Sequence, residues 1–242
     1  MQNSKIGWTH YTWNPWWGCN KVSAACRHCY IGQIMRRSGN EPFDGPMRTK
    51  TTWRLPFRWN RAAIGTGERL RIFTCSMSDF FHPGADKWRC EAWAIIQACQ
   101  NLDWLILTKR PELIRDRLPS DWGTGYPNVW MGVTVEDQSH IKRIDKLAKI
   151  PAAVRFVSAE PLLGPVYFGR RLRQLDWVIT GCEKAAKAKR RGLENSWVRN
   201  IRDECEASGV ALFHKQYYQG NKIMFDGLID GKIYQKWPAS TA

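Results

Sequence analysis

Short runs of apolar residues recur along the chain from residue 70 onward, separated by longer stretches of mixed character. Six such runs cover residues 71–75, 104–107, 129–133, 154–157, 177–179 and 210–213. Continuous apolarity over so few residues is typical of parallel strands that are buried on both faces. Successive runs begin roughly 22 to 34 residues apart, which is about the length of one strand–helix unit. The pattern therefore predicts repeated βα units.

Amphipathic segments between the runs predict helices over residues 87–100, 136–149 and 196–208. In the first segment, Trp88, Ala92 and Ile96 recur at helical spacing on one face. Gly209 directly follows the third segment, and glycine is the usual residue at a helix end. A shorter helix is predicted over residues 30–37.

Alternation of Tyr11 and Trp13, just before a proline, predicts a further strand near the N-terminus. With it the strand count is six or seven, which is fewer than the eight of a closed barrel. Short right-handed crossovers then give an α/β sheet that curls into a half-open barrel. We expect one domain over residues 1–242, in which 40–68 form an irregular insertion and 217–242 a C-terminal extension.

Each apolar run ends in polar residues. These ends cover residues 76–79, 108–110, 134–137, 158–160, 181–183 and 214–216. A single polar residue in such a place is most often a helix cap, but ligands of parallel α/β folds bind at the carboxyl ends of the strands. Six polar ends in succession predict a shared site there.

Three cysteines near the N-terminus, Cys19, Cys26 and Cys29, are spaced C-x6-C-x2-C. Three thiolates on one loop predict a metal or cluster site that lacks one ligand. Zinc prefers four ligands, and His10 or His28 could supply the fourth, so a zinc site remains open. A [4Fe–4S] cluster held by three thiolates leaves one iron free to bind S-adenosylmethionine. One electron then cleaves that cofactor and yields a 5′-deoxyadenosyl radical.

Composition narrows the choice of partner. The chain carries 37 Lys and Arg against 22 Asp and Glu, a net charge of +15 spread along its length. Such an excess indicates either a self-repelling surface or a polyanionic partner, because Lys and Arg that neutralise phosphates give sequence-independent affinity. Residues 184–191 are unusually basic and are expected to contact a polyanion or solvent.

Residues 48–61 combine cations and aromatics in a way that is typical of a nucleic-acid interface, where rings stack on bases and cations hold phosphates. The candidate residues are Arg48, Lys50, Trp53, Arg54, Arg58, Trp59 and Arg61. In the alternative interpretation, the tryptophans of this stretch simply cover the core.

The eight cysteines and the N-terminal residues bear on location. Disulfides explain so many cysteines poorly in a reducing compartment, and no apolar signal segment opens the chain. No apolar run approaches the ~20 residues that span a bilayer. We expect a cytoplasmic protein without a membrane partner.

The run 8–30, which contains the three cysteines, resembles the opening of a phage-type three-cysteine-motif family in the radical S-adenosylmethionine superfamily. Later segments match in order: residues 76–81, 107–112, 132–136, 158–163 and 213–216. The resemblance implies a partial (β/α)6 TIM-like barrel with a [4Fe–4S] cluster at its mouth, S-adenosylmethionine as cofactor and an external one-electron reductant. For a phage-encoded protein the location would be the host cytoplasm. The x6 gap departs from the usual C-x3-C-x2-C spacing.

The resemblance also implies roles for single residues. Cys19, Cys26 and Cys29 would bind the cluster, and Ser76, Ser78 and Asp79 would hold the amino group of the cofactor. Its ribose, carboxylate and adenine would contact His28, Lys109, Thr134, Glu136, Ser158 and Glu160. Lys215 and Gln216 would contact substrate or cofactor, with Lys215 as a catalytic candidate.

The 181–183 strand end departs from the Gly-Gly-Glu that the family leads us to expect, because Cys182 stands at its centre. A thiol there is a candidate hydrogen-atom donor, or else a small buried residue. The phage context, the charge and the aromatic–basic stretch together favour a nucleic-acid base as substrate, with DNA preferred and a thymine-derived base as one example. A zinc-stabilised nucleic-acid-binding or nuclease-type protein and a radical enzyme for a small metabolite remain alternatives.

Overall fold

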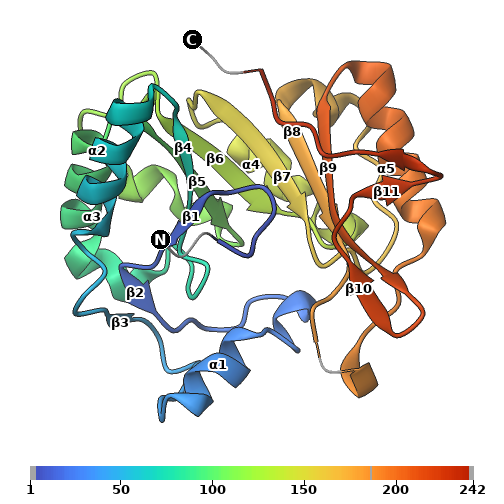
Figure 1. Cartoon of the computed structure of the whole chain (residues 1–242), viewed down its shortest axis with the longest axis horizontal. Helices are drawn as coiled ribbons and strands as arrows, with labels where there is room; N and C mark the ends of the chain where they lie inside the picture. Colours follow the sequence, from blue (N-terminus) through green and yellow to red (C-terminus); the bar gives the residue numbers. More distant parts are fainter. Residues whose placement is uncertain (1–3, 186, 240–242) are drawn as a thin grey trace.

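An eight-stranded curled sheet forms the centre of the computed structural model, which describes residues 4–185 and 187–239 (Figure 1). Its strands, in spatial order, are β1 (Tyr11–Trp13), β4 (Leu70–Thr74), β5 (Leu102–Thr108), β6 (Val129–Thr134), β7 (Val154–Ala159), β8 (Trp177–Gly181), β9 (Ala211–Gln219) and β10 (Lys222–Met224). Neighbouring strands from β1 to β9 are parallel, and only β10 is antiparallel to its neighbour. The predicted α/β half-barrel is confirmed.

Helices cover the outer face of the sheet, with α2 and α3 on one flank and α5 on the other (Figure 1). The α-helices are α1 (Ile31–Arg37), α2 (Leu55–Thr66), α3 (Asp86–Ala98), α4 (Lys142–Leu147) and α5 (Asn195–Ser208). The 3₁₀ turns are η1 (Ala24–Cys26), η2 (Pro83–Ala85), η3 (Pro111–Leu113), η4 (Arg115–Arg117), η5 (Gln138–His140), η6 (Gly169–Gln174) and η7 (Lys187–Lys189). Two small ribbons complete the fold: β2 (Trp16–Trp17) with β3 (Met47–Arg48), and β11 (Leu228–Ile229) with β12 (Lys232–Ile233).

The predicted irregular insertion is wrong over part of its length, because α2 forms between residues 55 and 66. Pro56 lies in the first turn, where its missing N–H costs nothing and its fixed φ suits a helix. Gly67 ends the helix with a φ of +71°. The predicted helix over 136–149 is broken, since η5 precedes a short α4.

Two apolar layers hold the sheet. The outer layer packs the strands against the helices, and the inner layer fills the hollow of the curled sheet. The inner layer is mostly aromatic and includes Trp8, Trp130, Phe156, Trp177 and Phe213. The Phe156 ring lies directly over Gly132, so a side chain at that position would overlap it. This part of the interior is a packed core, not a channel.

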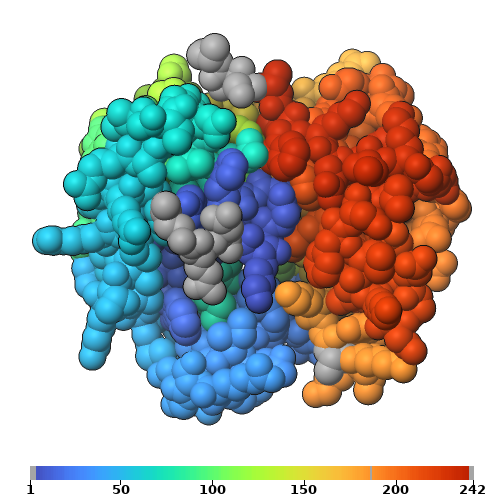
Figure 2. Space-filling model, viewed as in Figure 1, coloured from blue at the N-terminus to red at the C-terminus, as the bar shows by residue number. Residues whose placement is uncertain are grey.

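Both ends of the chain close the hollow on its open side. Trp8 lies in the inner core, and its carbonyl accepts a hydrogen bond of 3.2 Å from Trp237 Nε1. Figure 2 shows the dark blue N-terminal segment between the α2 side of the molecule and the red C-terminal region. Among the helices of the described ranges, none is both long and apolar enough to cross a membrane.

Candidate functional site

The cysteine loop begins directly after β2 and is attached to the end of β4. Gly18 N donates to the Met77 carbonyl at 3.0 Å, and the Ser78 hydroxyl donates to the Gly18 carbonyl. Gly18 has a φ of +97° and faces the carbonyl of Gly45, so a side chain at this position has no room. Cys19 N donates to Pro42 O at 3.0 Å. These bonds fix the start of the loop over the first strands of the sheet.

The far side of the same loop reaches the ends of β6 and β8. Ser23 Oγ donates to Glu136 at 2.6 Å, and Arg191 Nη1 donates to the Ala24 carbonyl at 2.9 Å. His28 Nδ1 lies 3.4 Å from Glu183 Oε2. The loop therefore spans the carboxyl ends of the strands, as the polar strand ends predicted.

The three thiols of this loop are free, partly exposed and electrostatically coupled. Burial, together with the nearby carboxylate of Asp79, raises the pKa of Cys19 to about 12, and burial also raises the pKa of Cys29. In residues 4–185 and 187–239, no three or more His, Cys, Asp or Glu side chains converge to hold one metal ion. A single zinc ion needs its sulfur ligands about 2.3 Å away, all around one point. A four-iron cluster takes each thiolate on a different iron, so it does not require the thiolates to converge on one point.

Three strand-end carboxylates lie beneath the loop, and each faces a cation. Glu136 is fully buried, 2.7 Å from Arg143 Nη1 and 3.8 Å from Lys109 Nζ. Burial alone would raise the pKa of Glu136, but these charges and the Ser23 hydrogen bond hold it below its usual value. Glu160 pairs with Lys215, and Glu183 pairs with Arg191. The charges are thus compensated before any ligand binds.

Strand register places two hydroxyls on the inner face of the sheet. Thr134 pairs with Ser158, which pairs with Ile179, and Ile179 pairs with Phe213 of the inner core. Side chains that are paired across parallel strands point to the same face. Thr134 Oγ1 is buried without a hydrogen-bond partner among the described residues, so it is available to a ligand.

The expected residues at the end of β4 hold the framework together. Asp79 accepts hydrogen bonds from Phe81 N at 2.9 Å, Thr108 Oγ1 at 2.7 Å and Lys109 N at 3.0 Å. Ser76 Oγ lies 3.1 Å from Asn14 Nδ2, and Asn14 also accepts from Met77 N. These contacts position the loop and leave Asp79 little capacity for a cofactor.

Arg110 is a site residue that the sequence reasoning did not single out. Its Nη2 donates to Asn20 O at 3.0 Å and lies 3.9 Å from Cys19 Sγ. Its Nε is buried and has no partner in the described part of the chain. A signal existed, because Arg110 closes the polar end of β5. Its positive charge favours thiolate over thiol at Cys19.

Cys182 is completely buried, and its backbone N donates to Gln216 O at 3.0 Å. Gln216 Nε2 in turn donates to the Cys182 carbonyl at 2.7 Å. Burial raises the pKa of the Cys182 thiol to about 12. This environment fits the small buried residue of the alternative interpretation.

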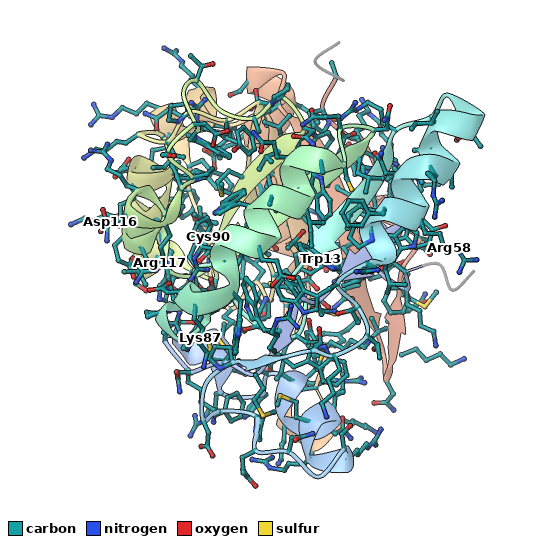
Figure 3. All side chains as sticks on the ribbon, turned by 90° about the vertical axis from the view of Figure 1, so that its left-hand side faces the viewer. Trp13, Arg58, Lys87, Cys90, Asp116 and Arg117 are labelled. Atoms are coloured by element: carbon teal, nitrogen blue, oxygen red, sulfur yellow. The ribbon has the colours of Figure 1, made fainter. Side chains whose placement is uncertain are left out.

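The predicted nucleic-acid segment is corrected at its aromatic positions. Trp53 and Trp59 are buried to 5% and 7% exposure, so they cannot stack on bases. Trp59 stacks on Tyr11 instead, and Arg48 lies over Trp53 and pairs with Glu91 at 2.8 Å. The tryptophans cover the core. The exposed cations that remain are Lys50, Arg54, Arg58 and Arg61, and Figure 3 shows Arg58 pointing outward from α2.

The surface pockets of the described residues include the following two. The larger, about 650 Å³, lies between α3 and the segment 116–126, where Figure 3 shows Cys90, Asp116 and Arg117. None of the predicted site residues lines it. A second pocket of about 590 Å³ adjoins the cysteine loop and is lined in part by Cys29 and α1.

Comparison with known proteins supports the fold. The family described as "Protein of unknown function (DUF5131)" matches residues 3–238. A spore photoproduct lyase variant with bound AdoMet and dinucleoside spore photoproduct superposes with a TM-score of 0.51 at 12% identity, covering 90% of this chain and 67% of that chain. Another variant of that lyase, with the dinucleoside, gives a TM-score of 0.48 at 12% identity and the same coverage. Comparison with curated proteins found no match.

Proposed function

We propose that this chain, which belongs to the family described as "Protein of unknown function (DUF5131)", is a radical S-adenosylmethionine enzyme that modifies a nucleic-acid base. The observation that carries the proposal is the cysteine loop, which bears three free thiols and contacts residues that follow the parallel strands β4, β5, β6 and β8. A structural zinc loop has no need of such a position. The fold shared with the AdoMet-bound lyase agrees with this function.

The donor set suits an iron–sulfur cluster, because Cys19, Cys26 and Cys29 are the three thiols of one loop and Arg110 lies beside the first. When bound, the cluster and S-adenosylmethionine would supply a 5′-deoxyadenosyl radical from one electron of an external reductant. Thr134, Ser158 and Lys109 would face the cofactor from the inner side of the sheet. The aromatic inner core beneath them excludes water from that end of the hollow.

The remaining strand-end residues would orient the ligands. The Glu160–Lys215 ion pair links the end of β7 to β9 next to Gly181, whose missing side chain leaves room for the Glu160 carboxylate. The Glu183–Arg191 pair and His28 lie just beyond the end of β8, the strand between β7 and β9. Substrate that enters between these pairs would meet charged groups that are already oriented.

The proposed substrate is a DNA base, a thymine derivative being one example. Support comes from the net charge of +15 and from the dinucleoside that the lyase of similar fold binds. A base in a duplex would have to be flipped out of the stack to reach the strand ends. The phage context of the resemblance makes a modified phage base a natural target.

The test begins with protein purified without oxygen. We expect iron and acid-labile sulfide in equal amounts, and release of 5′-deoxyadenosine after addition of S-adenosylmethionine and a reductant. Cys29→Ala is expected to abolish both, whereas Cys90→Ala, an exposed thiol on α3, should retain both. Thermal unfolding of both variants checks that they fold.

A protein that carries zinc and no sulfide would refute the proposal in favour of the zinc-stabilised alternative. If the protein bears a cluster and releases 5′-deoxyadenosine but modifies no DNA, the radical chemistry is supported. The substrate would then be a small metabolite, as in the second alternative.

A further inference from the structure

We propose that the pocket beside α1 binds the sugar–phosphate backbone of DNA and so holds the target strand next to the cysteine loop. The reason for holding a strand there rests on the proposed function, but the binding itself does not. The pocket measures about 590 Å³, which is ample for a phosphodiester and its neighbouring sugars. It lies between α1 and the basic turn η7, two elements that are far apart in sequence.

Positive charge dominates the lining of this pocket. Its cations are Lys21, Arg27, Arg36, Arg37 and Lys189, and no carboxylate lines it. In the described part of the chain none of these five forms an ion pair, whereas Arg48, Arg117 and Arg199 elsewhere on the surface are each paired with a carboxylate. Five uncompensated charges around one concavity repel one another, and a bound polyanion removes that repulsion.

The shape of the pocket favours a nucleotide chain over a lone anion. Phe43 provides an aromatic wall, and Lys21 Nζ lies 4.6 Å from the centre of its ring. Gly32 faces the same ring, and a Cβ there would lie 3.3 Å from it. Proteins that bind single-stranded DNA commonly combine an aromatic ring, which lies against a base or sugar, with cations that contact the phosphates.

The pocket adjoins the cysteine loop, so a strand bound in it would lie close to that loop. Cys29 contributes to the lining, so a strand that is bound here passes directly beside the proposed cluster ligands. Arg191, two residues after Lys189, donates to the carbonyl of Ala24 in the loop. Figures 1 and 2 show α1 and the segment around η7 together at the lower edge of the molecule, well away from α2.

This location differs from the stretch 48–61, but it includes Lys189 of the basic run 184–191, for which the sequence predicted contact with a polyanion or solvent. The exposed arginines of α2, Arg58 and Arg61, belong to the predicted interface but line neither pocket. Arg58 and Arg61 therefore provide a matched control for Arg36 and Arg37, because each pair consists of two exposed arginines on a helix.

The experiment measures binding of a fluorescent single-stranded DNA oligonucleotide by purified full-length protein at a series of salt concentrations, with duplex DNA as a second arm. The double variant Arg36→Gln/Arg37→Gln is expected to bind at least ten-fold more weakly at low salt. Its slope of log affinity against log salt should shrink by about 1.4, because each lost phosphate contact on a single strand contributes about 0.7. Arg58→Gln/Arg61→Gln should leave affinity and slope unchanged.

The opposite ranking of the two double variants, or equal small losses from both, would overturn the proposal. Circular dichroism and the melting temperature show whether each variant is folded. Failure of the cluster chemistry in the unmodified protein would refute the proposed function and leave the binding result intact.

Discussion

At the scale of single residues, alternation along a strand decides which neighbours share the site. Lys215 pairs with Glu160, which follows the end of β7. His214, the next residue, pairs in register with Thr180, and its Nδ1 lies 2.8 Å from the Thr180 hydroxyl. The sequence predicted that residues 214–216 end a strand, but β9 continues to Gln219. The sequence could not tell which of these residues meets a ligand, because that depends on register.

His214 makes stability depend on pH. It is almost completely buried, and burial lowers its pKa to about 4. In the unfolded chain His214 binds a proton below about pH 6.5, whereas in the folded protein it stays neutral down to about pH 4. The free energy of unfolding therefore falls by about 3 kcal/mol as the pH is lowered over that range. His214→Gln should remove this slope. Urea unfolding of both proteins at pH 7.5, 6, 5 and 4 measures it.

The comparison in that experiment is between slopes, since the variant also loses some stability at every pH. Parallel profiles for the two proteins would show that His214 does not titrate in this way. His10 and His82 make the same contacts in both proteins. Their contribution to the pH dependence therefore cancels when the two slopes are compared.

Other residues show why composition alone misleads. Arg48 and Trp53 have the composition of a nucleic-acid contact, yet one pairs with Glu91 and the other is buried. Arg110 belongs to a polar strand end that the sequence analysis named, but it was given no role there, and it lies beside Cys19. Residue type states what a side chain can do, and only packing states whether it is free to do it.

At the scale of elements, local signals predicted the strands well and misjudged α2. Prolines, glycine and tryptophans over 40–68 favoured an irregular segment, but Pro56 occupies a helix start and Gly67 a helix end. The same residues that break a helix in its interior mark its ends when they are correctly placed.

Two glycines of α2 test that account. Gly65 lies inside the helix with nothing near its absent side chain, so Gly65→Ala should stabilise the protein by about 0.5 to 1 kcal/mol. Gly67 has a φ of +71°, so Gly67→Ala should destabilise it by about 1 kcal/mol. Chemical denaturation of the two variants gives both signs. Equal effects would contradict the assignment of Gly67 as the helix end.

The cysteine loop is the element that sequence could describe but not place. Its anchors join Ser23 to Glu136, 113 positions apart, and Ala24 to Arg191, 167 positions apart. No local pattern encodes such pairs. The order of polar strand ends predicted that the loop and the strands share a site, and the individual bonds follow only from the curl of the sheet.

At the scale of the whole molecule, the half-barrel divides into a closed end and a charged end. Aromatic side chains and both chain ends fill the hollow at one end, while paired carboxylates and the cysteine loop occupy the other. An open sheet exposes its inner face unless something covers it. Closure by the segment around Trp8 and by Trp237 therefore protects the core.

Trp237 is the residue on which that closure depends. Its ring packs 5.0 Å from Phe213 and 4.7 Å from the guanidinium of Arg71, and its Nε1 donates to Trp8 O. Because the ring is half-buried, Trp237→Ala should lower the free energy of unfolding by about 2 kcal/mol. Hydrogen exchange should accelerate around residues 6–10, whereas Phe225→Ala, 52% exposed, should change stability by less than about 0.5 kcal/mol. A Trp237→Ala protein with unchanged stability and unchanged exchange near Trp8 would mean that the two ends of the chain do not hold the hollow closed.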